Sequence, residues 1–558
     1  MNSLNLLRCS GLILFFALPG RLLAAPVNTG PVVSISAGNL RGYFEGGEAV
    51  FKGIPYAAPP VGDLRWRPPM PPAPWRGERD ATRAASPCVQ GAAGLGPFIK
   101  PMADAYGAAY NVEPLASSED CLYLNVWVPN WPVQGSLPVM VWLHGGSNTA
   151  GSGAQSTYDA TSLASHGVIV VTINYRLGVM GFFSHPALSA ESAHHSSGNY
   201  GLLDQLAALQ WVQNNISRFG GDPGNVTLFG ESAGSIDAGM LITSPLAAHL
   251  FGRAILESGP PFGLGPMPAL REAEAAGLAI ANAAVHSGAN QIENLRRLPA
   301  SELQRIANAH GPYIASNILD GWVIPELPAV AYASGAAQHV DLIVGLNGRE
   351  LSAFRLLAAA AAKQASKPQA GGSASGAISN LAATTRPLYG AWTYAAIAKY
   401  VSEAIVNRDR GIDQASNDML MACPIGALAT LAGATGRNVF VYKFDRNIPG
   451  KGEAELGAFH GLEIPYVFNA FHDPSWRWLP FTDVDFRLSA EMETYWTNFA
   501  KTGDPNSYGI PAWPVWKSGT EGYLEFSPQA APTAQKGFSP SFCYLSFDRV
   551  RKELAGSK

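Results

Sequence analysis

A serine in a glycine-rich turn is the feature of this sequence that most directly indicates chemistry. Ser232 is the central residue of Gly230-Glu-Ser-Ala-Gly234, after the apolar run Val226–Phe229 and before the helix-compatible stretch 235–242. A turn between a strand and a helix strains the serine backbone and needs small neighbours, because the two chain segments pass close together. A helix start also directs N–H groups toward negative charge. This setting favours a nucleophile over a structural turn.

A nucleophilic serine needs a base, and the base needs an acid that orients it. His460 lies in a small-residue loop, 457–461, and is one of eleven histidines. In the chain order serine, acid, histidine, the acid lies beyond a strand end and before the histidine. Glu350, six residues after the apolar run Leu342–Val344, fits that order. These residues are therefore the candidates, although position alone does not single out one histidine or one of 42 acidic residues.

A second glycine-rich segment precedes the serine. His144-Gly-Gly-Ser147 follows the apolar run Val139–Leu143, where a loop that donates N–H groups to an oxyanion belongs. Its place in the chain favours that role over a plain Gly-Gly turn. No residues with metal-ligand spacing accompany the pair His194-His195. The chemistry indicated is acyl transfer through serine, and no metal or organic cofactor is implied.

Short apolar runs alternate with helix-like stretches, which is typical of a mostly parallel sheet flanked by helices. In the stretch Leu202–Ser217, apolar residues recur at helical spacing and predict a core-facing helix. The fold class expected is therefore α/β. The runs expected as strands are Val139–Leu143, Val168–Ile173, Val226–Phe229, Ala254–Leu256, Leu342–Val344 and Val439–Tyr442.

No linker-like break divides the chain, so residues 26–558 are expected to form one large domain. The alanine-rich and then glycine-rich stretch Leu356–Ser379 predicts a helix end followed by a flexible loop. The proline-rich stretch Ile54–Trp75 predicts an extended segment that wraps the surface.

The amino-acid composition and net charge limit the classes of molecule that the protein is expected to bind. Of the 558 residues, 47% are hydrophobic and 14% are charged, so the chain can bury a large core. The formal net charge is −4 and no long basic run occurs, which excludes the charge pattern that nucleic-acid or anionic-membrane binding needs. The expected partner is a small molecule.

The first 25 residues predict a cleavable export signal. Arg8 precedes the apolar stretch 11–18, and Ala24-Ala25 supplies a small-residue cleavage site. A membrane anchor is disfavoured because the apolar stretch is shorter than the roughly 20 residues of a spanning helix. Cys9 lacks the context of a lipid-attachment site. The mature protein is thus expected to be secreted or periplasmic.

Four cysteines remain after residue 25: Cys88, Cys121, Cys423 and Cys543. In an exported chain this even number makes two disulfides plausible, and three pairings are open. Four reduced, buried cysteines are the alternative.

Several longer motifs resemble those of type-B carboxylesterases, the family that also holds the cholinesterases and some fungal lipases. The resemblance extends from Val32 to Phe547. The motifs that carry it are Phe51–Val61, Ser118–Trp127, Asn174–Gly178, Phe219–Pro223 leading into Gly230–Gly234, Gly345–Glu350 and His460–Tyr466.

This resemblance implies an α/β-hydrolase fold and assigns roles to single residues. It implies Ser232 as nucleophile, Glu350 as acid and His460 as base. By the same likeness, N–H groups of Gly146, Ser147 and Ala233 form the oxyanion hole. It also implies the disulfides Cys88–Cys121 and Cys423–Cys543 and an ion pair between Arg65 and Glu119.

The chain departs from the family pattern at three points. Ser147 stands where the family usually has a third glycine, and Arg349 and Leu351 flank Glu350 where an acid and a glycine are common. No tryptophan lies between Cys88 and Cys121, so the cation–π site that cholinesterases offer a quaternary ammonium is not expected. Esters with apolar groups are the expected substrates.

Three other functions remain open. A non-catalytic adhesion protein of this fold is disfavoured because Ser232 and His460 are retained. A lipase would need an apolar lid, for which 98–110 is a candidate. An esterase for a bulky or polycarboxylic natural product, such as a toxin, is the third, and the stretch 356–379 would then shape its entrance.

Overall fold

The structure, a computed structural model, describes residues 30–262, 267–288, 290–309, 316–364, 374–527 and 531–544. The predicted export segment 1–25, with Cys9, lies outside these residues. Two sheets are present. The small one is formed by β1 (Val32–Ile35), β2 (Gly38–Arg41) and β5 (Glu78–Asp80).

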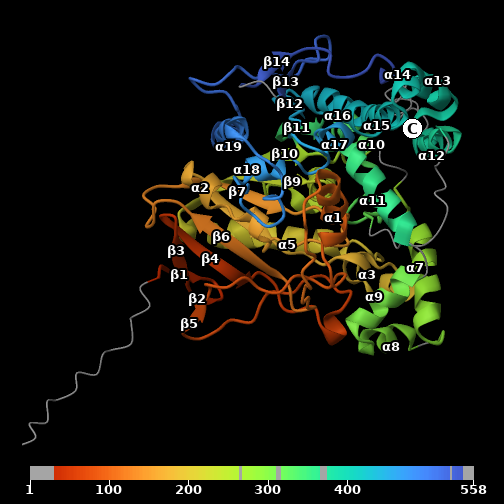
Figure 1. Cartoon of the computed structure of the whole chain (residues 1–558). Coiled ribbons are helices and arrows are strands. Elements are labelled where there is room, and N and C mark those ends of the chain that lie inside the picture. The colour runs from red at the N-terminus through yellow and green to blue at the C-terminus, as the bar shows by residue number, and fades with distance from the viewer. Residues whose placement is uncertain are drawn as a thin grey trace, which may run out of the picture.

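The large sheet has eleven strands in the order β14-β13-β12-β11-β10-β9-β7-β8-β6-β4-β3 (Figure 1). In chain order these are β3 (Tyr43–Glu45), β4 (Glu48–Pro55), β6 (Tyr123–Val128), β7 (Leu137–Leu143), β8 (Ile169–Ile173), β9 (Gly221–Glu231), β10 (Arg253–Glu257), β11 (Asp341–Asn347), β12 (Val439–Phe444), β13 (Tyr523–Phe526) and β14 (Thr533–Gln535). Strands β8, β7, β9, β10, β11, β12 and β13 are parallel to their neighbours in that series, and the remaining strands pair antiparallel.

The helices are α1 (Gly96–Tyr106), α2 (Thr161–Ser165), α3 (Gly178–Phe182), α4 (Pro186–Glu191), α5 (Tyr200–Asn215), α6 (Ala233–Thr243), α7 (Leu270–Ala284), α8 (Gln291–Arg297), α9 (Ala300–Ala309), α10 (Pro328–Ser334), α11 (Glu350–Gln364), α12 (Ala374–Tyr389), α13 (Thr393–Ala398), α14 (Val401–Val406), α15 (Arg408–Asn417), α16 (Cys423–Gly433), α17 (Glu453–Leu456), α18 (Ile464–Val467) and α19 (Asp483–Thr502). Short 3₁₀ turns are Gly62–Leu64, Ser156–Tyr158, Ile216–Phe219, Pro245–Ala247 and Gly390–Trp392, and Asp418–Ala422 forms a π-helical turn between α15 and α16.

Alternation along the central strands separates two hydrophobic cores. Val139, Val141 and Leu143 of β7 pack in the core that also contains the apolar residues of α5 and α6. Met140 and Trp142 of the same strand pack in the core on the other face, with the apolar residues of α19. Because successive side chains of a strand point to opposite faces, a strand covered on both faces is apolar throughout.

The α/β fold and its mostly parallel sheet confirm the expectation from the sequence. All six predicted runs lie in the parallel part of the sheet, and the predicted helix is α5. The prediction of a flexible loop at the end of the stretch 356–379 is wrong for residues 374–379, because α12 begins at Ala374. Helix α11 continues to Gln364, and residues 365–373 lie outside the described ranges.

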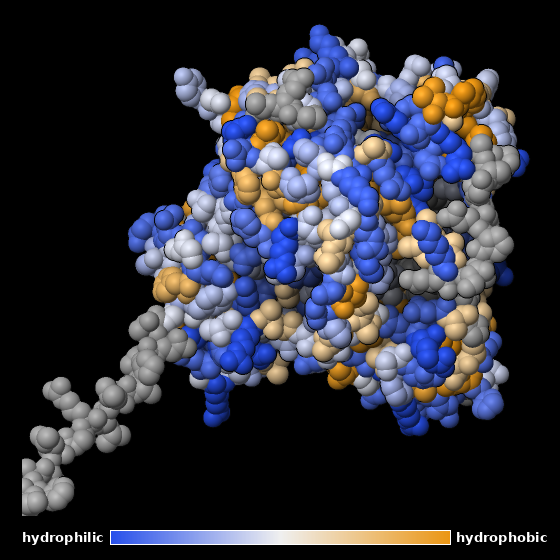
Figure 2. Space-filling view, in the orientation of Figure 1, coloured by the Kyte–Doolittle hydropathy of each residue, from blue (hydrophilic) through white to orange (hydrophobic). Residues whose placement is uncertain are grey.

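The visible surface is largely polar, and one of its apolar areas lies over α13 and α14 at the upper right (Figure 2). The exposed large apolar side chains of these two helices and of the turn before them are Trp392, Tyr394, Val401, Ile405 and Val406. Among the helices in the described ranges, none is both long and apolar enough to cross a membrane.

Candidate functional site

Ser232 lies at the sharp turn between β9 and α6. Its backbone has φ 55° and ψ −121°, a conformation that L-residues rarely adopt. A Cβ atom added at Gly234 would lie 2.0 Å from the carbonyl oxygen of Leu143. The glycine is therefore required by the close approach of β7 to the first turn of α6. This turn lifts the Ser232 hydroxyl out of the sheet.

Three sequence-predicted residues from distant parts of the chain meet at this hydroxyl. His460 Nε2 lies 2.8 Å from Ser232 Oγ, and His460 Nδ1 lies 2.7 Å from Glu350 Oε2. The imidazole is buried, and the Glu350 side chain is fully enclosed. A nucleophile, a base and an acid that orients the base require this connection.

The position of Glu350 is fixed on both sides of its carboxylate. Its Oε1 accepts a hydrogen bond of 2.6 Å from the backbone N–H of Asn347, and its own backbone N–H donates to Asn417 Oδ1. The unusual neighbour Arg349 points elsewhere, toward Asp413 and the Ala454 carbonyl. The departures from the family pattern beside Glu350 thus leave its contact to His460 in place.

The glycine loop, residues 144–151, follows β7 and lies beside Ser232. Gly146, Ser147 and Asn148 have φ values of 103°, 57° and 55° in succession. Within the described part of the chain, the N–H groups of Gly146, Ser147 and Ala233 donate no hydrogen bond. The Ser147 side chain is exposed, whereas Asn148 is buried. Unpaired N–H groups on two sides of a serine are the arrangement that holds an oxyanion.

A carboxylate that the sequence did not single out also contacts His460. Glu231 Oε1 lies 3.2 Å from His460 Nε2. Burial lowers the pKa of His460, but Glu231 and Glu350 outweigh this and raise it to about 9. Burial raises the pKa of Glu231 to about 8, against the effect of His460. Its place next to Ser232 in the turn motif was the only sequence signal.

A second buried carboxylate supports Glu350 indirectly. Glu463 accepts hydrogen bonds from Ser258 Oγ, at 2.8 Å, and from Asn347 Nδ2. Burial and the nearby Glu350 raise the pKa of Glu463 to about 7. Because the backbone N–H of Asn347 also donates to Glu350, Glu463 supports the segment that positions Glu350. The sequence placed Glu463 within a motif but gave it no role.

Two half-buried aromatic rings flank His460. The ring centroids of Phe354 and Phe98 lie 4.9 Å and 6.2 Å from that of His460. Phe354 belongs to α11, and Phe98 belongs to α1, which occupies most of the segment 98–110 considered as a lid. Helices α1 and α11 lie side by side in Figure 1. The surroundings of His460 are therefore apolar on this side.

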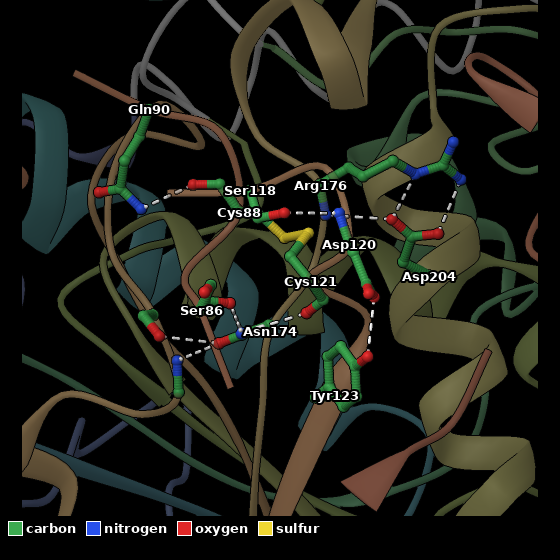
Figure 3. The surroundings of a disulfide bond; sticks show 12 residues. Ser86, Cys88, Gln90, Ser118, Asp120, Cys121, Tyr123, Asn174, Arg176 and Asp204 are labelled. Carbon is green, nitrogen blue, oxygen red and sulfur yellow. Dashed lines mark hydrogen bonds and ion pairs between the residues drawn. A yellow bond between two sulfur atoms is a disulfide. The ribbon is translucent and has the colours of Figure 1, made fainter. Parts of the chain in front are cut away.

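Both disulfides have the pairing that the family resemblance implied, Cys88–Cys121 and Cys423–Cys543. Figure 3 shows Asn174 beside the first one, where its Nδ2 donates to the Cys121 and Ser86 carbonyls. Its Oδ1 accepts from Ser152 and Gly153, which directly follow the glycine loop. One side chain thus joins the disulfide region to the loop beside Ser232.

The implied ion pair between Arg65 and Glu119 is present and is not an ordinary surface pair. Its two hydrogen bonds measure 2.8 Å and 2.6 Å, and the Arg65 side chain is buried. Arg65 also donates to the carbonyls of Leu295 and Leu298. The guanidinium therefore ties the first disulfide region to the end of α8.

Comparison with known proteins places this chain in a family. The model of the carboxylesterase family matches residues 29–543. The chain is 40% identical to fumonisin B1 esterase of Sphingopyxis macrogoltabida over 517 residues, which are 89% of this chain and 86% of that protein. It is 35% identical to para-nitrobenzyl esterase of Bacillus subtilis over 502 residues, which are 88% and 94% of the two chains.

A solved structure agrees with these sequence matches. The crystal structure of a Geobacillus stearothermophilus carboxylesterase aligns with a TM-score of 0.77 at 34% identity, over 93% of this chain and 99% of that one. Family, fold and relatives lead to one conclusion: the chain belongs to the carboxylesterase family and is a carboxylic ester hydrolase.

Proposed function

We propose that this protein hydrolyses esters through an acyl-enzyme on Ser232, with His460 as the base and Glu350 as the acid. The observation that carries the proposal is the pair of hydrogen bonds, 2.8 Å and 2.7 Å, that connects these three side chains. In the acylation step, Ser232 Oγ attacks the ester carbonyl carbon while His460 Nε2 takes the hydroxyl proton. The bond between that carbon and the alcohol oxygen then breaks, and His460 gives its proton to the leaving alcohol.

Deacylation repeats the sequence with water. A water oxygen attacks the acyl carbon, its proton goes to His460 and then to Ser232 Oγ, and the carboxylic acid leaves. In both steps negative charge develops on the carbonyl oxygen. The N–H groups of Gly146, Ser147 and Ala233 are the proposed donors to it, and Glu350 stabilises the protonated imidazole.

The proposed substrates are esters with apolar groups. Phe98 and Phe354 beside His460 support this choice, because such rings favour an apolar acyl or alcohol group. An esterase for a natural-product toxin is the second candidate. It is favoured by the relative at 40% identity, whose name describes it as a fumonisin B1 esterase.

The proposed mature protein is one domain, residues 26–558, secreted or periplasmic after removal of residues 1–25. The two disulfides support an oxidising compartment. N-terminal sequencing of the exported protein tests this point. A chain that is still intact at Met1, or that is retained in the cytoplasm, contradicts it.

The test of the catalytic proposal is an ester panel assayed on the wild type and on Ser232→Ala. The panel holds p-nitrophenyl esters of graded acyl length, fumonisin B1 and a choline ester. We expect turnover of the apolar esters or of fumonisin B1 and loss of activity in Ser232→Ala. Ser244→Ala is the matched control, because Ser244 is a buried serine directly after the other end of α6.

The same panel separates the alternatives. Activity that remains in Ser232→Ala contradicts the proposed nucleophile. No turnover of any ester by the wild type favours the adhesion protein. Activity that rises abruptly when an ester passes its solubility limit favours the lipase, and faster hydrolysis of the choline ester contradicts the substrate proposal.

A further inference from the structure

We propose that Asp237, on α6, is a positioning residue that holds the glycine loop at a fixed position relative to Ser232. The residue lies five positions after the serine, on the helix that the serine begins, and its side chain is fully enclosed. The inference rests on the proposed function, because it takes the N–H groups of Gly146 and Ser147 as the oxyanion donors.

Three neutral amide groups surround the Asp237 carboxylate. Its Oδ1 accepts hydrogen bonds from Asn148 Nδ2, at 3.1 Å, and from Asn317 Nδ2, at 2.7 Å. Its Oδ2 accepts a hydrogen bond of 2.6 Å from Gln205 Nε2. All four side chains are buried. Asp237 therefore joins α6 to three separate segments: the glycine loop, helix α5 and the segment that begins at residue 316.

A carboxylate at this core position is expected to lower the stability of the fold. Among the described residues it forms no ion pair, and burial raises its pKa to about 6 although the three amides lower it. A buried carboxylate without a cation destabilises a fold relative to a well-packed apolar residue. A contribution to stability therefore does not explain why an aspartate occupies position 237. A rigid link between α6 and the glycine loop does explain it.

The glycine loop needs such a link. Ser147 and Asn148 both have positive φ, and strained residues persist only where their surroundings determine them closely. The Asn148 side chain has contacts at both ends, because its Oδ1 lies 3.1 Å from Tyr175 Oη while its Nδ2 donates to Asp237. Its carbonyl oxygen accepts from Gly178 N at 2.7 Å.

Tyr175 extends the link to the start of the loop. Its hydroxyl also lies 2.7 Å from the carbonyl oxygen of His144, and its ring stacks on the His144 ring with centroids 4.4 Å apart. His144 and Asn148 lie on either side of the donor residues Gly146 and Ser147 in the sequence. Tyr175 contacts both of them, and Asn148 is also bonded directly to Asp237 on the helix that begins after Ser232.

The consequence concerns the transition state more than the substrate. Donors to an oxyanion act at full strength only at the correct position, and Asp237 fixes that position relative to Ser232 without contacting the substrate. Loss of one donor costs about 100- to 1000-fold in kcat, so we expect a loosened loop to lower kcat by about tenfold or more and to leave KM nearly unchanged.

The test compares Asn148→Ala, Asp237→Leu and the double variant. For each variant, kcat, KM, the inhibition constant of a trifluoromethyl ketone and Tm are measured. We expect kcat and the affinity for the ketone, which mimics the tetrahedral intermediate, to fall in parallel. The double variant is expected to lose little more than either single one, because both remove the same contact. Asp237→Asn keeps an acceptor for Asn148 and is expected to retain most of kcat.

Gln205→Met is the matched control, because Gln205 bonds the other oxygen of the same carboxylate but belongs to α5. We expect it to lower Tm and to keep kcat. An unchanged kcat in Asn148→Ala overturns the inference, as does an equal fall in Gln205→Met. If Asp237→Leu does not fold, Asn148→Ala alone decides. Ser232→Ala, assayed in parallel, tells failure of this inference from failure of the proposed nucleophile.

Discussion

Glu231 Oε1 lies 3.2 Å from His460 Nε2, the same nitrogen that faces the hydroxyl of Ser232. The base therefore has a carboxylate on each side, Glu350 at Nδ1 and Glu231 at Nε2. Both favour the protonated imidazole and raise the pKa of His460 to about 9, although burial acts in the opposite direction.

This arrangement predicts the direction of the pH dependence. Only the neutral imidazole can accept the Ser232 proton, so kcat/KM is expected to fall as the pH drops through the pKa of His460. Glu231→Gln removes one negative charge and is expected to move this acid limb to lower pH by about one unit. The measurement is a pH profile of kcat/KM for both proteins.

Glu302 on α9, whose side chain is 41% exposed, offers the control for that profile. Its charge is not among those that shift the pKa of His460, so Glu302→Gln is expected to leave the acid limb in place. An acid limb of Glu231→Gln that stays in place or moves to higher pH would show that Glu231 does not stabilise the imidazolium.

Glu350→Gln tests the acid directly. An amide at this position presents an N–H group to His460 Nδ1 and favours the wrong tautomer of the ring, so kcat is expected to fall by about 1000-fold or more. Single-turnover kinetics with an activated ester measure the acylation step. The control is Glu231→Gln, the other carboxylate beside the base. If that variant loses more acylation activity than Glu350→Gln, the assignment of the acid is wrong.

Six of the seven strands in the parallel part of the sheet were predicted from the sequence, because their central residues are apolar and buried on both faces, as in β8 and in Ala254–Leu256 of β10. The seventh, β13, alternates buried and half-buried residues and was not predicted. The antiparallel strands β4 and β6 carry buried or half-buried polar residues and were not predicted. Asn125 of β6 illustrates the reason, because its Oδ1 accepts a hydrogen bond from Gly53 N across the sheet. That partner is known only once the strands are paired.

The candidate site divides in the same way. Ser232 has a local signature, since a strand, a turn of small residues and a helix lie in one continuous stretch. Asp237 has none, and Glu231 and Glu463 have only their places inside motifs, which assign them no role. A buried carboxylate is defined by the groups that enclose it, and those groups come from distant segments such as Asn317 and Asn347. Sequence spacing could not select these three among 42 acidic residues.

Ser147→Gly tests the departure from the third glycine of the family pattern. The change keeps the backbone N–H, and the Ser147 side chain is exposed, so we expect kcat to stay within about threefold of wild type. Glycine adopts a φ of this sign without steric cost. Ser147→Val is the opposite case and is expected to destabilise the fold by about 1–3 kcal/mol. Urea denaturation and kcat are measured for both, and a large loss of kcat in Ser147→Gly would assign the hydroxyl a role in catalysis.

The two disulfides are expected to act differently. Cys423 and Cys543 are 120 residues apart, and the bond fixes the C-terminal region to α16. Their double replacement by serine is expected to cost about 2–5 kcal/mol in the free energy of unfolding, because a long loop regains its freedom in the unfolded chain. This pair lies outside the contacts of Ser232, so kcat is expected to stay unchanged below the melting transition.

Replacement of Cys88 and Cys121 by serine is expected to lower kcat as well as stability. Cys88 and Cys121 are only 33 positions apart, so this shorter loop gains less stability from closure. However, Gln90 hydrogen-bonds both the N–H and the carbonyl of Gly151 at the end of the glycine loop. Loss of the adjacent disulfide loosens this contact and, with it, the proposed oxyanion donors. The measurements are thermal denaturation and kcat for both double variants. Equal kcat values in the two variants would show that the Cys88–Cys121 disulfide does not affect catalysis.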